Sequence, residues 1–306
     1  MNPADAHRWY SLAANLGDAK AQFNLGVLYQ RGRGVSQNVS EAADWYGKAA
    51  RQGFTPAQLN LAALYEQGRG VKQSWAKAVE WYKKAAAETP ETSSSVPSEN
   101  NSSSGSSSSG SDFFSDAGIS SGKPPPTQSK PASSAAKTEG KAAAQYELAV
   151  ILLEGTNNDS SSSSGSQGSD GSTVEPNPAE GLDWLTKAAQ NSHARAQYHL
   201  AYAYDEGQHG LAPNPEVAAQ WYLKAGEQGY SPAMHNLGFC YERGDGVEQS
   251  DEFAAQWITK AAEAGSANAQ QHLGVLYEEG RGVAQSNAEA VKWYRKAALQ
   301  VWERDS

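Results

Sequence analysis

The 306-residue sequence has few sulfur-containing residues, which are the ones that form disulfides and many metal sites. It contains one cysteine, Cys240, and two methionines. One thiol cannot form an internal disulfide, and it cannot supply a cysteine-based zinc site by itself. No run of about 18 apolar residues occurs, so no transmembrane span is predicted. The N-terminal segment carries Asp5, His7 and Arg8 and lacks the apolar core of a signal peptide, which favours a cytoplasmic location.

The charge balance excludes another class of protein. Lysine and arginine total 25 and aspartate and glutamate 34, which gives a net charge of −9. A nucleic-acid binder that works through phosphate contacts needs the opposite sign, so no nucleic-acid partner is expected. The mean hydropathy is −0.67, yet the chain has nine tryptophans. Large apolar side chains in a sequence of such average polarity indicate that the polar residues are concentrated elsewhere.

Two serine-rich tracts carry much of that polarity. Residues 92–121 include 15 serines, and the tract continues through three consecutive prolines to about residue 134. A second tract covers about 157–177. Such segments have too few apolar side chains to offset the entropy lost when a backbone becomes ordered. Both are therefore predicted to be disordered insertions.

The remaining sequence repeats with a period of 36 residues. Seven tryptophans mark the period, and successive members lie 36 or 37 residues apart except across the two insertions, between Trp81 and Trp184: Trp9, Trp45, Trp81, Trp184, Trp221, Trp257 and Trp293. A second marker is an Ala-Gln pair with leucine three residues later, as at Ala21-Gln22 and Ala57-Gln58. Self-similarity at this period is typical of a solenoid.

Each unit predicts two helices. Apolar residues at Ala21, Leu25, Leu28 and Tyr29 follow a helical stripe, and a second stripe runs from about Ser40 to Gln52. A Gly-x-Gly turn such as 32–34 lies between them. The predicted fold is an all-α, right-handed superhelix of stacked helix pairs, with six full units after a leading second helix at 3–16.

These residues carry a family resemblance. The unit Ala-x-Ala-Gln-x-x-Leu-Gly-x-x-Tyr-x-x-Gly-x-Gly-Val-x-Gln, followed by Ala-x-x-Trp-Tyr-x-Lys-Ala-Ala, resembles the Sel-1-like repeat, a relative of the tetratricopeptide repeat. The best copies are 19–53, 56–86 and 267–298. Departures occur where Leu185 and Ile258 replace the tyrosine that follows tryptophan. The predicted organisation is repeats at 1–88, a disordered Ser/Pro-rich insertion at 89–140, and repeats at 141–306 with a disordered loop at 157–176.

Closure entropy grows slowly with loop length, so the array is expected to continue across both insertions. The first helix at 145–154 should then stack directly on the second helix at 76–86.

The patterns that suggest chemistry have simpler explanations. Gly-x-Gly turns resemble phosphate loops, but none follows a strand or ends in Gly-Lys-Ser/Thr, so inter-helix turns are expected. His199 and His272 occupy equivalent positions two units apart, too far for one metal, and are expected to be ordinary surface histidines. Cys240 lies on an apolar helix face and is expected to be a buried, unreactive thiol. No catalytic residue, metal ligand or cofactor site is predicted.

Some side chains stand out as sites of contact. Phe113 and Phe114 lie in an acidic island of the first insertion and form a candidate partner-docking segment, with flanking serines that are plausible kinase targets. Trp75 is out of phase with the repeat and Trp302 lies beyond the last unit, so both are candidate exposed or capping aromatics. A lysine follows the repeat tryptophan by three residues in every full unit, which predicts either a ridge that meets acidic partners or a solvated helix face. The leading helix has Leu12 at that position.

The resemblance implies a non-enzymatic adaptor or scaffold that binds protein or peptide partners through the surface of the solenoid. Members act in endoplasmic-reticulum-associated degradation, in chitin-synthase activation and in mitochondrial stress signalling. Two alternatives stay open: a hydrolase-like enzyme of the broader superfamily, and a fragment or regulatory subunit of a larger complex, such as a membrane-enzyme activator. Membrane insertion is not expected. Self-association through the exposed edge of the N-terminal helix is a further expectation.

Overall fold

The protein is an array of paired helices. The structure, a computed structural model, describes residues 3–87, 132–156 and 173–305, and describes side chains within 5–87, 138–156 and 173–300. The first helices of the units are α2 (Ala19–Arg31), α4 (Thr55–Gln67), α6 (Ala132–Glu154), α8 (Ala194–Glu206), α10 (Ser231–Arg243) and α12 (Ala267–Glu279). The second helices are α1 (Pro3–Asn15), α3 (Val39–Arg51), α5 (Trp75–Ala86), α7 (Pro178–Gln190), α9 (Pro215–Glu227), α11 (Asp251–Glu263) and α13 (Asn287–Asp305). No strand occurs in these ranges, and the predicted all-α class is confirmed.

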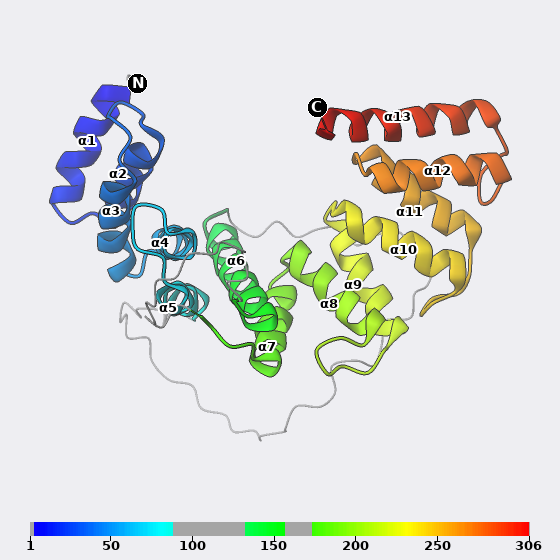
Figure 1. The fold of residues 1–306 in the computed structure, drawn as a ribbon, viewed down its shortest axis with the longest axis horizontal. Helices are drawn as coiled ribbons and strands as arrows, with labels where there is room; N and C mark the ends of the chain where they lie inside the picture. The colour runs from blue at the N-terminus through cyan, green and yellow to red at the C-terminus, as the bar shows by residue number, and fades with distance from the viewer. Residues whose placement is uncertain (1–2, 88–131, 157–172, 306) are drawn as a thin grey trace, which may run out of the picture.

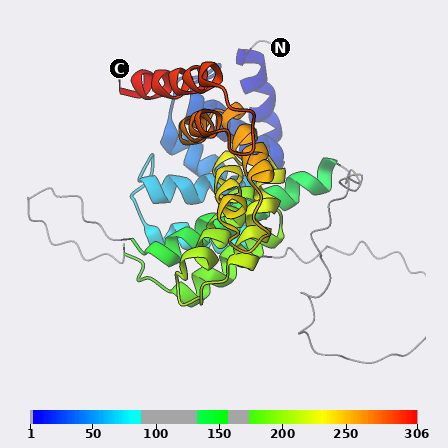
Figure 2. The same ribbon diagram turned by 90° about the vertical axis from the view of Figure 1, so that its right-hand side faces the viewer.

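The helices pack in chain order into a right-handed superhelix. Each helix contacts the helix before it and the helix after it, from α1 to α13. The stack follows an arc, and both ends of the chain lie on the same side of it (Figures 1 and 2). Figure 1 shows α4 and α6 on the inside of the arc and α5 and α7 on the outside. The first helices therefore form a concave surface, which we call the inner face.

Polar caps and glycines define where the helices begin and end. The side chains of Asn38, Asn214 and Ser250 accept hydrogen bonds from backbone N–H groups in the first turns of α3, α9 and α11. These bonds satisfy donors that have no partner inside the helix. Five first helices end at a glycine in the left-handed conformation, a backbone that side chains with a Cβ rarely adopt: Gly32, Gly68, Gly207, Gly244 and Gly280.

The second glycine of a Gly-x-Gly turn lies against the preceding unit. A Cβ on Gly70 would lie 2.5 Å from the carbonyl carbon of Val39, at the start of α3. A Cβ on Gly246 would lie closer still to Pro215 at the start of α9, and one on Gly282 closer still to Asp251 at the start of α11. The turns are therefore structural elements that seat one unit on the next, as the sequence predicted.

The array continues across the first insertion. Ala78 and Tyr82 of α5 share one apolar cluster with Ala144 and Leu148 of α6. The Lys83 ammonium of α5 also lies 2.7 Å from the Glu180 carboxylate of α7. Helix α6 begins at Ala132, ahead of the predicted boundary at residue 141, and its Gly140 lies against α4. Residues 132–140, which were assigned to the disordered insertion, are thus helical.

The second insertion leaves and re-enters the array at one point. The backbone N–H of Thr156 donates to the Val174 carbonyl at 3.1 Å, and the Val174 N–H donates to the Thr156 hydroxyl at 2.7 Å. The Asn177 N–H donates to the Leu152 carbonyl at 2.7 Å. Because the two ends meet in this way, α7 keeps its place beside α6.

A buried glutamine recurs beneath the first helices. The Gln197 amide donates to the Ala189 carbonyl at 3.0 Å and accepts from the Gln228 amide at 2.6 Å. Gln22 is held in the same way by the Ala14 carbonyl and the Gln52 amide. The unit of α10 departs from this pattern at both positions, since Met234 replaces the glutamine and Ala264 replaces the amide donor. The two replacements remove both partners of one hydrogen bond, which leaves no buried polar group without a partner.

We therefore expect Gln197→Met alone to lower the free energy of unfolding by about 1 kcal/mol, because it removes the hydrogen bonds that the buried Gln197 amide makes with the Ala189 carbonyl and the Gln228 amide. Adding Gln228→Ala should recover part of that loss. Urea denaturation of the two single variants and the double variant measures the coupling. Strict additivity of the two changes would contradict the pairing.

Candidate functional site

The first helices touch one another along the inner face. The Tyr146 hydroxyl of α6 lies 3.3 Å from Nε2 of His199 on α8. His235 of α10 and His272 of α12 lie ring to ring, with Nε2 of His235 3.3 Å from Nδ1 of His272. These contacts bring together residues of successive units, about one repeat apart in the sequence. Tyr198 of α8 lies near Tyr230, the residue before α10, with ring centroids 5.3 Å apart. The inner face is thus one continuous surface through α6, α8, α10 and α12.

The units differ from one another on this surface while their buried positions repeat. Counted from the alanine of the Ala-Gln marker, position +4 is a buried leucine in every unit: Leu25, Leu61, Leu148, Leu200, Leu237 and Leu273. Position +6 varies: Val27, Ala63, Val150, Tyr202, Phe239 and Val275. A scaffold needs the same core in each unit, whereas a surface that recognises a partner needs different side chains along its length. The aromatic residues at position +6 fall in α8 and α10.

A tyrosine hydroxyl links the two helices of most units. The Tyr222 hydroxyl of α9 donates to the Asp205 carboxylate at position +9 of α8, at 3.2 Å, and accepts from the Asn236 amide of the next unit at 3.1 Å. Tyr82 donates to Glu66 and Tyr294 to Glu278, both at 2.8 Å. Burial raises the pKa of Tyr82 and Tyr222 well above the ordinary range, and it raises the pKa of Tyr294 to about 12. These hydroxyls are therefore permanent donors to the inner-face carboxylates.

One of the two units that lack this hydroxyl holds a charged cluster instead. Ile258 replaces the tyrosine in the unit of α10 and α11, so Glu242 at position +9 has no tyrosine donor. The Glu242 carboxylate contacts the Arg281 guanidinium and lies 3.2 Å from Nε2 of His272. A proton on Nε2 of His272 satisfies Glu242, and Nδ1 of His272 then accepts from Nε2 of His235. Sequence comparison of the units revealed the departure at Ile258, but not this consequence.

The inner-face histidines differ from the surface residues that the sequence predicted. Burial lowers the pKa of His235 to about 4, and the neighbouring His272 adds to the effect. Burial also lowers the pKa of His193, His199 and His272. The rings pack against aromatic side chains, as His193 does on Tyr146, with ring centroids 4.8 Å apart. These histidines are neutral contact residues between units.

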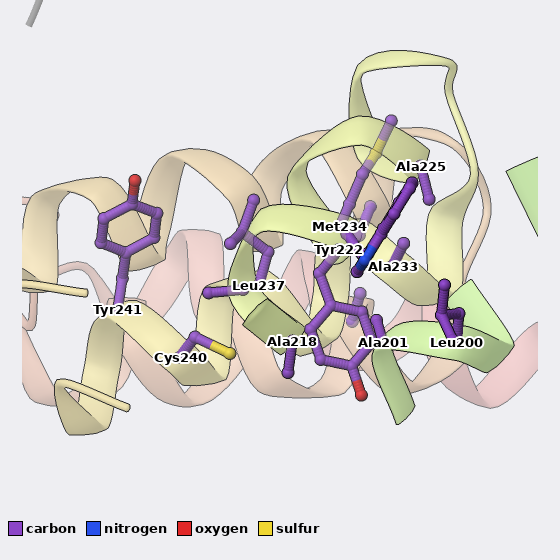
Figure 3. Packing of buried hydrophobic residues seen from close by; sticks show 14 of the residues in the cluster. Leu200, Ala201, Ala218, Tyr222, Ala225, Ala233, Met234, Leu237, Cys240 and Tyr241 are labelled. Atoms are coloured by element: carbon purple, nitrogen blue, oxygen red, sulfur yellow. The ribbon is translucent and has the colours of Figure 1, made fainter. Parts of the chain in front are cut away.

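A small hollow opens on the inner face between α8 and α10. Its volume is about 180 Å³, and Tyr202, Asp205, Phe239, Cys240 and Arg243 contribute to its wall. Cys240 is only 5% exposed, and burial raises its pKa to about 12, so its thiol stays protonated at neutral pH. The predicted burial of this thiol is confirmed. Figure 3 shows the core beneath the hollow, where the Tyr222 ring lies alongside Ala201 and Ala218.

The recurrent lysines lie on the second helices and cover tryptophans. In each full unit the lysine ammonium lies over the ring of the tryptophan three residues earlier, at 3.5 Å for Lys48 on Trp45 and 4.5 Å for Lys187 on Trp184. A cation over an indole face is an attractive contact. The leading helix α1 has Leu12 instead, and there Trp9 is 60% exposed and Leu16 90% exposed. The lysine ridge thus shields apolar rings of the array.

The structure places the predicted contact residues in different surroundings. Trp75 begins α5, is half-buried, and packs against the cluster of Ala78 and Leu148, in the middle of the array and not at an end. Trp302 lies on α13, but its side chain is outside the described part of the chain. Phe113 and Phe114 also lie outside the described residues. The inner-face residues of α8 and α10 were missed, although the differences between units at positions +2, +3 and +6 are visible in the sequence.

The described residues lack two further kinds of feature, a metal-ligand cluster and a membrane span. Among residues 5–87, 138–156 and 173–300, no three His, Cys, Asp or Glu side chains are grouped as metal ligands would be. In the helices that the structure describes, none combines the length and the apolar character needed to cross a bilayer.

Comparison with known proteins identifies the repeat. The family model of the Sel1 repeat matches residues 2–18, 19–54, 55–89, 142–161, 167–193, 194–230, 231–266 and 267–301. The segments at 142–161 and 167–193 flank the second insertion, so they are the two halves of one interrupted unit. Together the eight matches cover most of the chain. No curated protein matches it.

Two solved structures share the architecture. One is c5321, described as a protective antigen of uropathogenic Escherichia coli strains that displays an SLR fold; it matches with a TM-score of 0.70 and 29% identity over 96% of this chain. That match covers 48% of c5321, so this chain spans about half its length. The other is a Sel1 repeat protein from Oxalobacter formigenes, with a TM-score of 0.63, 22% identity, and coverage of 93% of this chain and 89% of that one.

Proposed function

Since the chain belongs to the Sel1 repeat family, whose helical solenoid is a fold typically used for protein–protein interaction, we propose that it is a non-catalytic adaptor that holds an extended segment of a partner protein on its inner face. The observation that carries the proposal is the contrast between repeated core positions and varied inner-face positions. Partner recognition accounts for that contrast, because packing alone requires no variation from unit to unit.

The aromatic side chains of α8 and α10 supply the strongest contacts in this proposal. Tyr202 is 38% exposed and stacks on Tyr198, with ring centroids 6.4 Å apart. Phe239 lies against both His235 and His272, with centroid separations of 4.7 and 4.6 Å. Rigid, partly exposed aromatic rings with few rotatable bonds are the side chains that dominate binding energy at protein interfaces.

Selection from a random-peptide display library tests the proposal. We expect the purified wild-type protein to enrich a defined set of peptides. Tyr202→Ala combined with Phe239→Ala should reduce recovery of those peptides about tenfold or more, since each lost aromatic anchor costs on the order of 1–2 kcal/mol of binding.

The matched control is Phe253→Ala, which removes another exposed ring, on the second helix α11. This variant should recover the enriched peptides as well as the wild-type protein does. Thermal midpoints establish that every variant is folded, and Tyr202→Ala alone serves if the double variant is unstable. Failure to enrich any peptide, or equal losses in the control and the test variant, would contradict an inner-face binding function.

A further inference from the structure

The hollow between α8 and α10 has the size and position to receive one side chain. Its volume of about 180 Å³ is several times the roughly 30 Å³ share of a water molecule in the liquid. It opens on the inner face at the two helices that carry aromatic residues at position +6. Tyr202 and Phe239 form its apolar wall, and Asp205, Glu206 and Asp245 supply three carboxylates.

The hollow carries an excess of negative charge. Arg243 is its one basic residue, so three carboxylates and one guanidinium give a net charge of −2. Within residues 5–87, 138–156 and 173–300, no ion pair includes any of the three carboxylates. Burial raises the pKa of Asp205. The hydrogen bond from Tyr222 and the charge of Arg243 lower it, and the nearby charges of Glu206 and Asp245 raise it further. A cation placed among these groups would relieve their mutual repulsion.

Arg243 offsets only part of that excess. Its guanidinium lies over the Phe239 ring, with the central carbon 5.4 Å from the ring centroid. The next junction shows the contrasting arrangement, since Glu242 is neutralised by Arg281 and contacts His272. The hollow therefore combines a net excess of carboxylates with an exposed aromatic face on Tyr202, and a cation gains from both.

We propose that this hollow binds the basic side chain, arginine or lysine, of an extended segment of the partner protein. The proposal rests on the proposed function, since it names the chemistry of the segment that the inner face would hold. The alkyl stem of the side chain lies along Tyr202, and its charged end meets Asp205 and Asp245. Charge complementarity selects this occupant over an acidic or purely apolar segment.

The test uses peptides that the wild-type 306-residue chain enriches from the random-peptide library. We expect these peptides to share a basic residue at one position. Replacing that residue by citrulline, if it is arginine, or by norleucine, if it is lysine, should weaken binding to the wild-type protein about tenfold. Asp205→Asn combined with Asp245→Asn should weaken binding of the unmodified peptide similarly, and it should make binding insensitive to the peptide replacement.

Two controls separate a specific contact from bulk electrostatics and from misfolding. Glu227→Gln with Glu263→Gln removes two charges from exposed positions in the last turns of α9 and α11, and it should leave affinity unchanged. The Asp205→Asn change retains a side-chain oxygen that accepts the hydrogen bond from the Tyr222 hydroxyl, so the fold should persist, which the thermal midpoint verifies. The peptide replacement tests the wild-type protein directly and does not depend on any protein variant.

The outcomes distinguish the two proposals. Enriched peptides that lack a shared basic residue, or equal affinity for the wild-type protein and the Asp205→Asn, Asp245→Asn variant, would overturn the basic-side-chain site and leave the adaptor function standing. Absence of any enriched peptide would overturn both.

Discussion

Gly282→Ala is expected to lower the free energy of unfolding by about 3 kcal/mol or more. Gly282 has φ +65°, a left-handed conformation that costs a residue with a Cβ roughly 1–2 kcal/mol. The added methyl would also overlap the backbone carbonyl oxygen of Asp251 at the start of α11, and forced overpacking costs roughly a further 1–3 kcal/mol. Backbone atoms cannot move aside as the end of a flexible side chain can. Urea denaturation followed by circular dichroism measures the loss.

Gly265→Ala is the matched control. Gly265 also has a left-handed backbone, with φ +93°, but no atom of another residue lies within 4 Å of the position its Cβ would occupy. The control therefore carries the conformational cost alone, and we expect it to lose roughly 1–2 kcal/mol. Equal losses at the two glycines would show that the contact between the turn and α11 is unimportant. A larger loss at Gly282 identifies the turn as the part that fixes the spacing of consecutive units.

Lowering the pH from 7 to 5 is expected to destabilise the folded protein. His193, His199, His235 and His272 all have pKa values lowered by burial, so the folded state takes up protons at lower pH than the unfolded chain, which takes them up near pH 6.5. The loss begins as the pH falls through 6.5, and for His235 it continues to about pH 4. Because the His235 ring is partly exposed, we expect this histidine to lower the free energy of unfolding by about 1 kcal/mol between pH 7 and pH 5. The other three histidines add to that loss.

Urea denaturation at several pH values between 7 and 5 measures this dependence. His235→Gln should flatten it, because the variant has no group at this position to protonate. The raised pKa values of Glu147 and Asp205 have the opposite sign, since their protonation favours the folded state, so they oppose the effect of the histidines as the pH falls. An unchanged slope in His235→Gln would mean that the histidine contacts between α10 and α12 contribute nothing to the acid sensitivity.

The local features of the fold were predictable because they recur in the sequence. The predicted first helix from Ala21 to Tyr29 became α2 at Ala19–Arg31, and the predicted second helix became α3 at Val39–Arg51. Both depend on apolar spacing and on glycines within one unit. The start of α6 was missed because residues 132–140 adjoin a serine- and proline-rich tract, whose composition masked their helical character.

The inner face was less predictable because it depends on contacts between units. His235 and His272 are at positions +2 and +3 of successive first helices, so their contact follows only when the stacking geometry is known. The same geometry makes Ile258 matter, since the missing hydroxyl leaves Glu242 to pair with Arg281 and His272. Trp75 was expected at an exposed or terminal position because it is out of phase with the repeat. Trp75 is instead the first residue of α5, and its ring packs against apolar residues of α4, α5 and α6.

The lysines that cover the repeat tryptophans give the protein a set of optical reporters. Six indoles, one in each full unit, lie under a cation at 3.5 to 4.5 Å, and they share one kind of surroundings. Trp9 on α1 has no such cover. A collisional quencher dissolved in water should therefore reach the indole of α1 before the six covered ones. The tryptophan fluorescence that remains at low quencher concentrations then comes mainly from the full units. When the array unfolds and the lysines separate from the indoles, the quencher should reach these tryptophans as well.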